Sequence, residues 1–412
     1  MSATPRSERA SPQGLEPQAL DVLAPAMRRR RRTVQAFPSP DSAAHVLVEG
    51  RQLVNFCGND YLGLAHHPAL SAALSAAAAK SGVGSGASHL ISGHGAEHER
   101  LEEELAAFTG RERALLFSTG YMANLAVLTA LAGRGERVLL DRLCHASLID
   151  GARLSGATLR RYPHADAEAA AGLLGGADEE PAVLVATDGL FSMDGDLAPL
   201  PALAHAAGAS DAWLVVDDAH GLGVLGASGR GTLEHFGLSA REVPVLVGTL
   251  GKAFGSFGAF VAGGRDLIEH LIQRARTYIY TTALPQPLAA ATRAALALAQ
   301  GESWRRERLH ELTARFRREA LRAGLPLGNS STPIQPVLLG TARAALAAQR
   351  ALAEAGLWVV AIRPPTVPAG GARLRVTLSA AHTEAQVERL IGELERICTP
   401  LLRSECAAGA SA

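Results

Sequence analysis

The sequence predicts an α/β protein, in which a large domain with a mainly parallel seven-stranded sheet is followed by a smaller C-terminal α+β domain. Seven short apolar runs occur between residues 114 and 261, and helical stretches of ten to fifteen residues separate most of them. Continuous apolar strands that alternate with helices are typical of a parallel sheet covered on both faces. After about residue 300 this alternation ends, which indicates a second domain.

Composition limits the function classes. The 412 residues are 48% hydrophobic, and 40 Lys and Arg balance 40 Asp and Glu, so no net field favours nucleic acid or anionic lipid. No apolar run is long enough to cross a membrane, and residues 1–25 lack the apolar core of a signal peptide. Four cysteines without CxxC or zinc-ligand spacing suit a reducing compartment. We therefore expect a cytoplasmic protein without a metal site.

Residues 1–58 form a predicted N-terminal segment. Residues 1–25 are expected to be a flexible lead-in, and Arg28–Arg32 follow as five consecutive arginines. Such a run is usually a solvated face, but one arginine could instead reach an anionic substrate. Two apolar runs around Gly50, at 47–49 and 53–56, indicate a β-hairpin.

Residues 59–295 form the predicted large domain. An alanine-rich helix over 68–80 precedes a Gly/Ser loop at 82–89 and a helix over 94–109. That loop does not follow a strand, so it is a poor dinucleotide-binding fingerprint. The predicted strands of the central sheet are 114–117, 138–140, 158–162, 182–186, 213–216, 245–247 and 259–261.

Residues 296–412 form the predicted small domain. A long polar helix over 303–323 opens it, and a helix beginning at residue 384 closes it. Between them we expect strands at 334–339, 357–362 and 374–378 and a helix over 341–355.

Polar groups follow the strands of the large domain, where ligands bind in open parallel sheets. Ser118–Asn124 is a small polar turn directly before a predicted helix and would suit a phosphate, although an ordinary helix cap explains it equally well. His145 and the loop 187–196 are individually weak signals. The pair Asp217-Asp218 resembles a Walker B element, but the chain lacks the GxxxxGK[ST] phosphate loop that this interpretation requires.

Lys252 lies in Gly-Thr-Leu-Gly-Lys between two apolar runs. Burial favours the uncharged amine, which is a nucleophile toward carbonyls. A surface lysine in a glycine-rich turn is the alternative. However, Asp217 and Lys252 together match what a pyridine cofactor needs, which is a carboxylate at its ring nitrogen and a lysine at its aldehyde.

The chain resembles the fold type I pyridoxal-phosphate enzymes and, within them, the α-oxoamine synthases, from about Met27 to Leu394. The matching motifs are Asn59–Leu64, Gly84–Ser88, Ser118–Tyr121, His145–Ser147, Phe191–Asp196, Asp217–Gly221 and Ile362–Pro368.

This resemblance implies a set of site residues around pyridoxal 5′-phosphate. Lys252, Asp217 and His145 would be catalytic, with His145 stacked on the cofactor ring. Further cofactor contacts would come from Gly120, Tyr121, Ser192, His220 and Thr249, and from Thr281 or Thr282 of a second subunit in a homodimer. Substrate contacts would come from Arg28, His145, Thr366 and Arg375.

The resemblance also implies a reaction, the decarboxylative condensation of L-alanine with a pimeloyl thioester of coenzyme A or acyl carrier protein. Glycine C-acetyltransferase, 5-aminolevulinate synthase and serine palmitoyltransferase share the Asp217, His145, His220 and Lys252 pattern. A cofactor-binding regulator would need an added DNA-binding module, for which residues 1–50 are too short and too rich in proline. A scaffold role would leave the polar strand ends unexplained.

Overall fold

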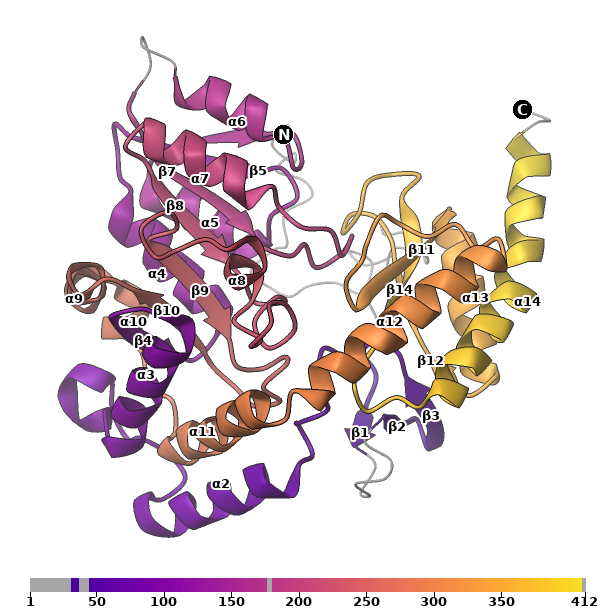
Figure 1. Ribbon diagram of the computed structural model, residues 1–412, viewed down its shortest axis with the longest axis horizontal. Helices are drawn as coiled ribbons and strands as arrows, with labels where there is room; N and C mark the ends of the chain where they lie inside the picture. Colours follow the sequence, from indigo (N-terminus) through magenta and orange to yellow (C-terminus); the bar gives the residue numbers. More distant parts are fainter. Residues whose placement is uncertain (1–30, 37–43, 176–179, 410–412) are drawn as a thin grey trace, which may run out of the picture.

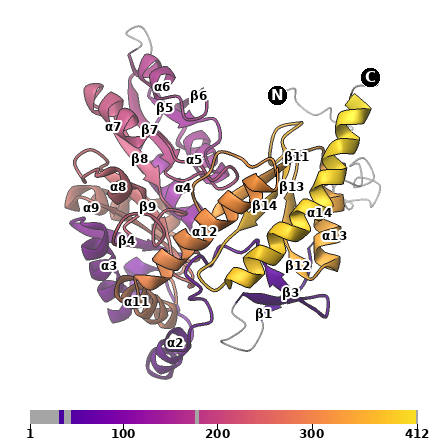
Figure 2. The same cartoon turned by 45° about the vertical axis from the view of Figure 1, so that its right-hand side comes forward.

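The computed structural model describes residues 31–36, 44–175 and 180–409, arranged as a larger and a smaller lobe joined by α12 (Trp304–Arg322) (Figures 1 and 2). The larger lobe contains the predicted seven-stranded sheet, with strand order β4-β10-β9-β8-β7-β5-β6. Its strands are β4 (Arg113–Phe117), β5 (Arg137–Asp141), β6 (Thr158–Tyr162), β7 (Ala182–Asp188), β8 (Trp213–Asp217), β9 (Val245–Thr249) and β10 (Ala259–Gly263).

The sheet is mainly parallel, as predicted. Among these seven strands, β10 alone has the reverse direction, and it pairs antiparallel with both β4 and β9. β9, β8, β7, β5 and β6 pair in parallel, and β4 shares their direction because it is antiparallel to β10. The carboxyl ends of β4, β5, β7, β8 and β9 therefore meet at one edge of the sheet.

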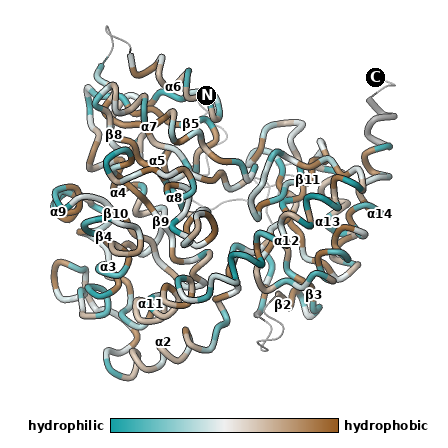
Figure 3. Tube along the Cα trace, in the orientation of Figure 1, coloured by the Kyte–Doolittle hydropathy of each residue, from teal (hydrophilic) through white to brown (hydrophobic). Residues whose placement is uncertain are grey.

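Apolar side chains alternate between the two faces of this sheet. On β8, Val215 packs into one hydrophobic cluster, whereas Leu214 and Val216 pack into another on the opposite face. The first cluster lies beneath α4 (Gly120–Leu131), α5 (Ala146–Ser155) and α9 (Arg265–Arg274). The second lies beneath α6 (Ala167–Leu174) and α7 (Leu200–Ala209). Burial on both faces explains the continuous apolar runs, which appear as hydrophobic stretches of the sheet in Figure 3.

α2, α3, α13 and α14 agree with the predicted helices to within a few residues, whereas η4, α8, α10 and α11 correspond to no helix predicted with bounds. A short π-helix, η4, follows the Gly/Ser loop. α11 packs against α2 and α3 at one end of the larger lobe (Figure 1). These helices are α2 (Pro68–Ser81), η4 (His89–Gly93), α3 (Ala96–Thr109), α8 (Thr232–Phe236), α10 (Arg276–Ile279), α11 (Gln286–Gly301), α13 (Ala342–Glu354) and α14 (Glu384–Gly409).

The smaller lobe contains two sheets. One has the order β11-β14-β13, from β11 (Ile334–Gly340), β14 (Ala372–Thr377) and β13 (Val360–Ile362). The other joins the predicted hairpin of β2 (His45–Val48) and β3 (Arg51–Asn55) to β1 (Val34–Ala36) and β12 (Leu357–Trp358). Antiparallel pairing of β2 with β3 confirms the hairpin.

The predicted strand at 357–362 is wrong as a single element. β12 pairs in parallel with β3, whereas β13 pairs antiparallel with β14, so the run is divided between two sheets at Val359. Val359 and Leu357 are fully buried, which explains why the run is continuously apolar although its partners change.

Residues 1–25 and the first three arginines of the run lie outside the described residues. The predicted domain boundaries at residues 58 and 295 stay a prediction. Among the residues that the structure describes, no helix is both long and apolar enough to cross a membrane.

Gly255 closes the loop that follows Lys252, with φ +59°, and a Cβ at this position would lie 2.3 Å from the backbone nitrogen of Ala65. We expect Gly255→Ala to lower the free energy of unfolding by roughly 1–3 kcal/mol, because the strained backbone and the clash must both be relieved. Gly251→Ala in the same loop is the control, since its Cβ would be 3.6 Å from the nearest atom. Urea denaturation measures both variants, and equal losses would contradict this explanation.

Candidate active site

A cavity of about 180 Å³ lies at the edge of the sheet where the parallel strands end. The loops after β4, β5, β7, β8 and β9 each contribute to its wall, so residues far apart in the sequence meet there. Predicted site residues that line it are Gly120, Tyr121, His145, Ser192, Asp217, His220, Thr249 and Lys252. Asn124, Asp188, Leu190 and Ala219 complete the lining.

Lys252 follows β9 and faces this cavity from a tight loop, in which Gly255 N–H donates to the Lys252 carbonyl at 2.9 Å. Burial lowers the pKa of its ammonium to about 8, although the nearby Asp217 and Asp188 carboxylates favour the charged form. A substantial fraction of the amine is therefore neutral near physiological pH, as a nucleophile or a base requires.

Asp217 is the last residue of β8 and is buried. One carboxylate oxygen accepts a hydrogen bond from Asn124 Nδ2 at 2.6 Å, and the other accepts from Ala219 N–H at 3.0 Å. Two donors fix the plane of the carboxylate within the cavity wall. The adjacent Asp218 is not part of that wall, because its side chain accepts from Thr232 N–H on the other side of the strand end.

A hydrogen-bonded chain connects Asp217 to His145. Asn124 Nδ2 also donates to Ser147 Oγ at 2.8 Å, and Ser147 Oγ lies 2.7 Å from His145 Nδ1. Ser147 N–H also points at the same ring nitrogen, at 3.3 Å. His145 Nδ1 is thus assigned as the acceptor, which places the proton of the neutral ring on Nε2. Burial lowers the pKa of His145 and so favours this neutral form.

His220 is oriented by a tyrosine from the N-terminal part of the chain. Tyr61 Oη lies 2.7 Å from His220 Nδ1, and both side chains are buried. Burial holds the pKa of His220 well below its usual value, and it raises the pKa of Tyr61 to about 12. A neutral imidazole and a protonated phenol therefore share this hydrogen bond.

Arg375 reaches toward the site from β14 of the smaller lobe. Its Nε donates to the Ser192 carbonyl at 2.6 Å, and both Nη atoms lie 3.3 Å from Asn59 Oδ1. Arg373, two residues earlier on the strand, instead forms an ion pair with Asp194. Arg373 therefore has a carboxylate partner, whereas the hydrogen bonds of Arg375 described above go to a carbonyl and an amide oxygen.

The start of α4 forms another part of the wall. Thr119 caps this helix by accepting from Met122 N–H at 3.2 Å, and Gly120 and Tyr121 are its first two residues. Their N–H groups and the positive end of the helix dipole suit an anion. Thr249 lines the same cavity, and its hydroxyl donates to the Gly258 carbonyl at 3.1 Å.

Several predicted site residues lie away from this cavity. Thr281 donates to the Thr277 carbonyl at 2.7 Å, and Thr282 is exposed. Thr366 is exposed in the loop between β13 and β14. Arg28 lies outside the described residues.

Sequence reasoning missed three residues with clear structural roles. Asn124 supports Asp217, Tyr61 supports His220, and Asp188 accepts from His145 N–H at 3.1 Å. Asp188 is the neighbour of Asp217 in the sheet register, and burial together with the Asp217 charge raises its pKa well above the usual value. Asn124 could have been found, because it lies one helical turn after Gly120 and shares its face of the helix.

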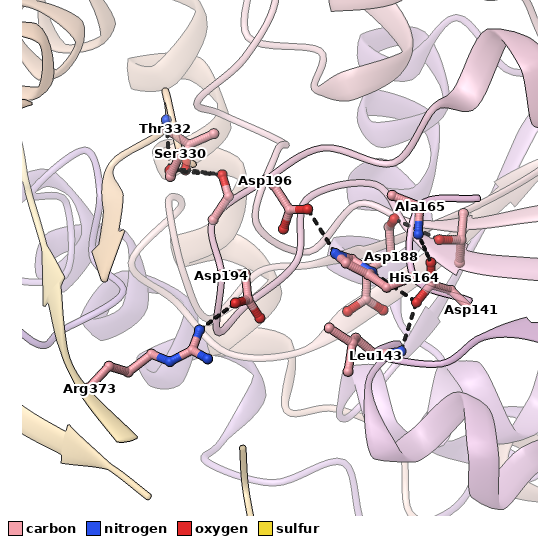
Figure 4. Close-up of polar contacts among 12 residues, drawn as sticks. Asp141, Leu143, His164, Ala165, Asp188, Asp194, Asp196, Ser330, Thr332 and Arg373 are labelled. Atoms are coloured by element: carbon pink, nitrogen blue, oxygen red, sulfur yellow. Dashed lines mark hydrogen bonds and ion pairs between the residues drawn. The ribbon is translucent and has the colours of Figure 1, made fainter. Parts of the chain in front are cut away.

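The loop that carries Ser192 is held from both lobes (Figure 4). His164 connects Asp141 at 3.1 Å to Asp196 at 2.8 Å, so it joins the end of β5 to the loop after β7. From the other side, Ser330 and Thr332 hydroxyls donate to the Gly195 carbonyl at 2.8 and 2.9 Å. Ser192 is thereby positioned by contacts with elements that the sequence separates widely.

The cavity fits pyridoxal phosphate by the chemistry of its groups. Asp217 offers a fixed carboxylate for a pyridinium nitrogen, and Lys252 offers an amine with a lowered pKa for an aldehyde. The start of α4 offers N–H groups for a phosphate. These three groups lie on one continuous wall.

Comparison with known proteins agrees with this arrangement. The family described as aminotransferase class I and II matches residues 51–394. In solved structures, the fold is similar to that of serine palmitoyltransferase from S. paucimobilis with bound PLP-myriocin, at a TM-score of 0.86 and 32% identity over 90% of this chain and 93% of that one. The fold and the cavity thus define the class as an aminotransferase-type enzyme.

Relatives with higher sequence identity identify the family within this class. The 8-amino-7-oxononanoate synthase of Thioalkalivibrio sulfidiphilus is 60% identical over 90% of this chain and 94% of its own length. That of Methylococcus capsulatus is 62% identical over 89% and 93%. A solved 8-amino-7-oxononanoate synthase from Francisella tularensis has a TM-score of 0.74 and 33% identity, over 84% of this chain and 97% of that one. The chain belongs to the 8-amino-7-oxononanoate synthase family.

His164 gives a testable pH dependence. Burial alone would lower its pKa, but hydrogen bonds to Asp141 and Asp196 outweigh burial and raise it to about 10. Because the folded pKa is raised, this stabilisation is complete below pH 6.5 and is lost as the pH rises toward 10. We expect the free energy of unfolding to fall by up to about 1.4 kcal/mol per pH unit across this window. His164→Gln should lack that component, and parallel pH profiles of the two proteins would contradict the expectation.

Proposed function

We propose that this chain condenses L-alanine with a pimeloyl thioester and releases 8-amino-7-oxononanoate, carbon dioxide and the free thiol, a step of biotin biosynthesis. The observation that carries the proposal is the joint position of Lys252 and Asp217 on one cavity wall, in a chain 60% identical to a synthase of that name. Three free cysteines among the described residues, Cys57, Cys144 and Cys398, support a cytoplasmic location.

Pyridoxal 5′-phosphate, when bound, supplies a conjugated ring that takes up the electron pair released at the alanine Cα. Asp217 would hold a proton on the ring nitrogen, and His145 would contact the ring. Ser192 and His220 would contact its phenolic side. Gly120, Tyr121 and Thr249 would hold the phosphate.

Thr281 and Thr282 lie outside this cavity in their own chain. We assign them to the phosphate of a second copy, which makes the active unit a homodimer with shared sites. Their position in the segment just before α11, one half-buried and the other exposed, supports this assignment because their side chains are accessible to a neighbouring chain.

Lys252 would act twice, first as the residue that holds the cofactor aldehyde and then as the base that takes the proton from the alanine Cα. The same amine would return a proton to the product. A pKa of about 8 suits both directions of transfer, because neither the protonated nor the neutral form is rare at physiological pH.

Arg375 would bind the alanine carboxylate. Its guanidinium is buried and donates hydrogen bonds to the Ser192 carbonyl and to the Asn59 amide oxygen. Holding the carboxylate with two parallel hydrogen bonds would fix the direction of the Cα–H bond toward Lys252. His145, Thr366 and Arg28 would contact the acyl substrate, whose carrier is coenzyme A or an acyl carrier protein.

An assay of the purified protein with alanine, glycine and serine against pimeloyl, acetyl and palmitoyl thioesters tests the proposal. Alanine with the pimeloyl thioester should give the highest kcat/KM and release one carbon dioxide for each thiol. Preference for glycine with the acetyl thioester would instead indicate glycine C-acetyltransferase, which the high identity to the oxononanoate synthases does not favour.

Asp217→Asn should reduce kcat by about a hundredfold or more, because a neutral amide cannot hold the ring nitrogen protonated. Asp218→Asn is the matched control. Burial raises the pKa of Asp218 to about 8, so that its carboxyl is largely protonated at neutral pH and an amide resembles it. Steady-state kinetics of the two variants decide the assignment, and a greater loss in Asp218→Asn would reverse it.

Arg375→Ala should raise the KM for alanine by about ten- to a hundredfold, which corresponds to the loss of hydrogen bonds to a charged group. Arg375→Lys should recover only part of this loss, because an ammonium lacks the two-pronged geometry. Arg373→Lys is the control, since Arg373 is already paired with Asp194. Alanine titration followed by cofactor absorbance measures the effect, and unchanged alanine affinity in Arg375→Ala would remove the residue from the site.

A further inference from the structure

Three histidines gather away from the cofactor cavity, at the junction of η4 and α3. His89 begins η4, His94 follows η4, and His98 lies in the first turn of α3. One ring nitrogen from each lies within 4.8 Å of the other two. None of them lines the cavity described above. Nothing in the proposed reaction uses these imidazoles.

Hydrogen bonds hold two of these rings in the way that metal-bound histidines are usually held. His94 Nε2 contacts Glu99 at 3.1 Å, and His98 Nε2 contacts the Leu284 carbonyl. Metal-bound imidazoles typically give their second nitrogen to a carboxylate or a backbone carbonyl, which fixes the ring and the tautomer. These contacts leave His94 Nδ1 facing the cluster, whereas His98 Nδ1 would have to give up the Gly95 N–H before it could bind a metal ion.

Two further contacts of the cluster would have to give way to an ion, and the Gly95 N–H would then need a new acceptor, such as water. His89 Nδ1 and His94 Nδ1 are 2.9 Å apart, and His98 Nδ1 accepts from Gly95 N–H at 3.0 Å. A hydrogen bond explains the first distance without an ion. Neighbouring ligands of a tetrahedral ion with metal–nitrogen bonds of about 2.0–2.1 Å are about 3.3–3.4 Å apart, so the two rings would separate by roughly 0.4 Å on binding. On binding, the proton between His89 and His94 would move to His89 Nε2 or to solvent.

The three imidazoles differ in access to solvent. His89 and His98 are buried, whereas the His94 side chain is 25% exposed, so an ion could enter beside His94. His89 is also stacked on Tyr278, with ring centroids 4.9 Å apart.

We propose that His89, His94 and His98 form a binding site for a borderline divalent cation such as Zn²⁺. Three imidazole ligands are a preferred set for zinc and its first-row neighbours, and water would complete a tetrahedral shell. The bound ion would fasten the Gly/Ser loop and η4 to α3. Because His98 also contacts the Leu284 carbonyl, the ion would brace the segment before α11. The site is structural, and it is independent of the reaction assigned above.

Equilibrium dialysis of the cofactor-loaded, full-length protein tests this proposal. After chelator treatment and removal of the chelator, we expect dialysis against buffered Zn²⁺ to load one zinc per chain, measured by atomic absorption. His94→Ala should lose this zinc. Glu99→Gln should keep the site but weaken zinc binding by about 10–100-fold, because Glu99 orients a ligand without being one. Co²⁺ in place of Zn²⁺ should give the intense visible absorption of a tetrahedral site.

His205→Ala is the matched control, because it removes an exposed imidazole from α7, far from the cluster in the sequence. It should bind zinc as the wild type does. Far-ultraviolet circular dichroism and cofactor absorbance show whether each variant is folded, and His89→Ala provides a second ligand variant if His94→Ala unfolds. Wild-type protein without stoichiometric zinc, or equal zinc in His94→Ala and the wild type, would overturn the proposal.

Discussion

The buried carboxylate of Asp217 is the group on which the rest of the site depends. Its two oxygens are held by Asn124 and by the Ala219 N–H, and its charge is one of the influences on Lys252, Asp188 and His145. Burial alone would drive Lys252 and His145 further toward neutrality, and Asp217 opposes it in both. A single charge at the end of β8 therefore adjusts the ionisation of the amine and the imidazole around it.

The sheet explains how this buried carboxylate comes to lie among hydrogen-bond donors. Five strands end at one edge, so hydrogen-bond donors from α4, α5 and the strand-end loops converge on a small volume. The same convergence places Asp188 beside Asp217, where two carboxylates cannot both ionise easily. The smaller lobe also contributes to the site, since Arg375 contacts the loop that carries Ser192.

Most of the large domain could be predicted because burial on both faces of a sheet requires apolar runs, and such runs are visible in the sequence. Lys252, Asp217 and His145 could be predicted because each follows such a run. Tyr61 could not be assigned, because its role comes from a partner 159 residues away. The division of residues 357–362 between two sheets was equally hidden, since burial makes both halves apolar whatever their partners are. His89, His94 and His98 lie within ten residues of one another, so their spacing is visible in the sequence, but the placement of the His98 ring depends on its contact with the distant Leu284 carbonyl.

The pairing of β3 with β12 also sets an order of events during synthesis of the chain. Val54 of β3 pairs with Leu357 of β12, so the sheet formed by the first strands is completed only after the ribosome has made most of the chain. At a synthesis rate of about 5–20 residues per second, roughly 15–60 s pass between the synthesis of the hairpin at 45–55 and the synthesis of β12. During this interval the unpaired edge of β3 is open to other strands, and a nascent chain would rely on chaperones or on rapid burial of its neighbours to protect it.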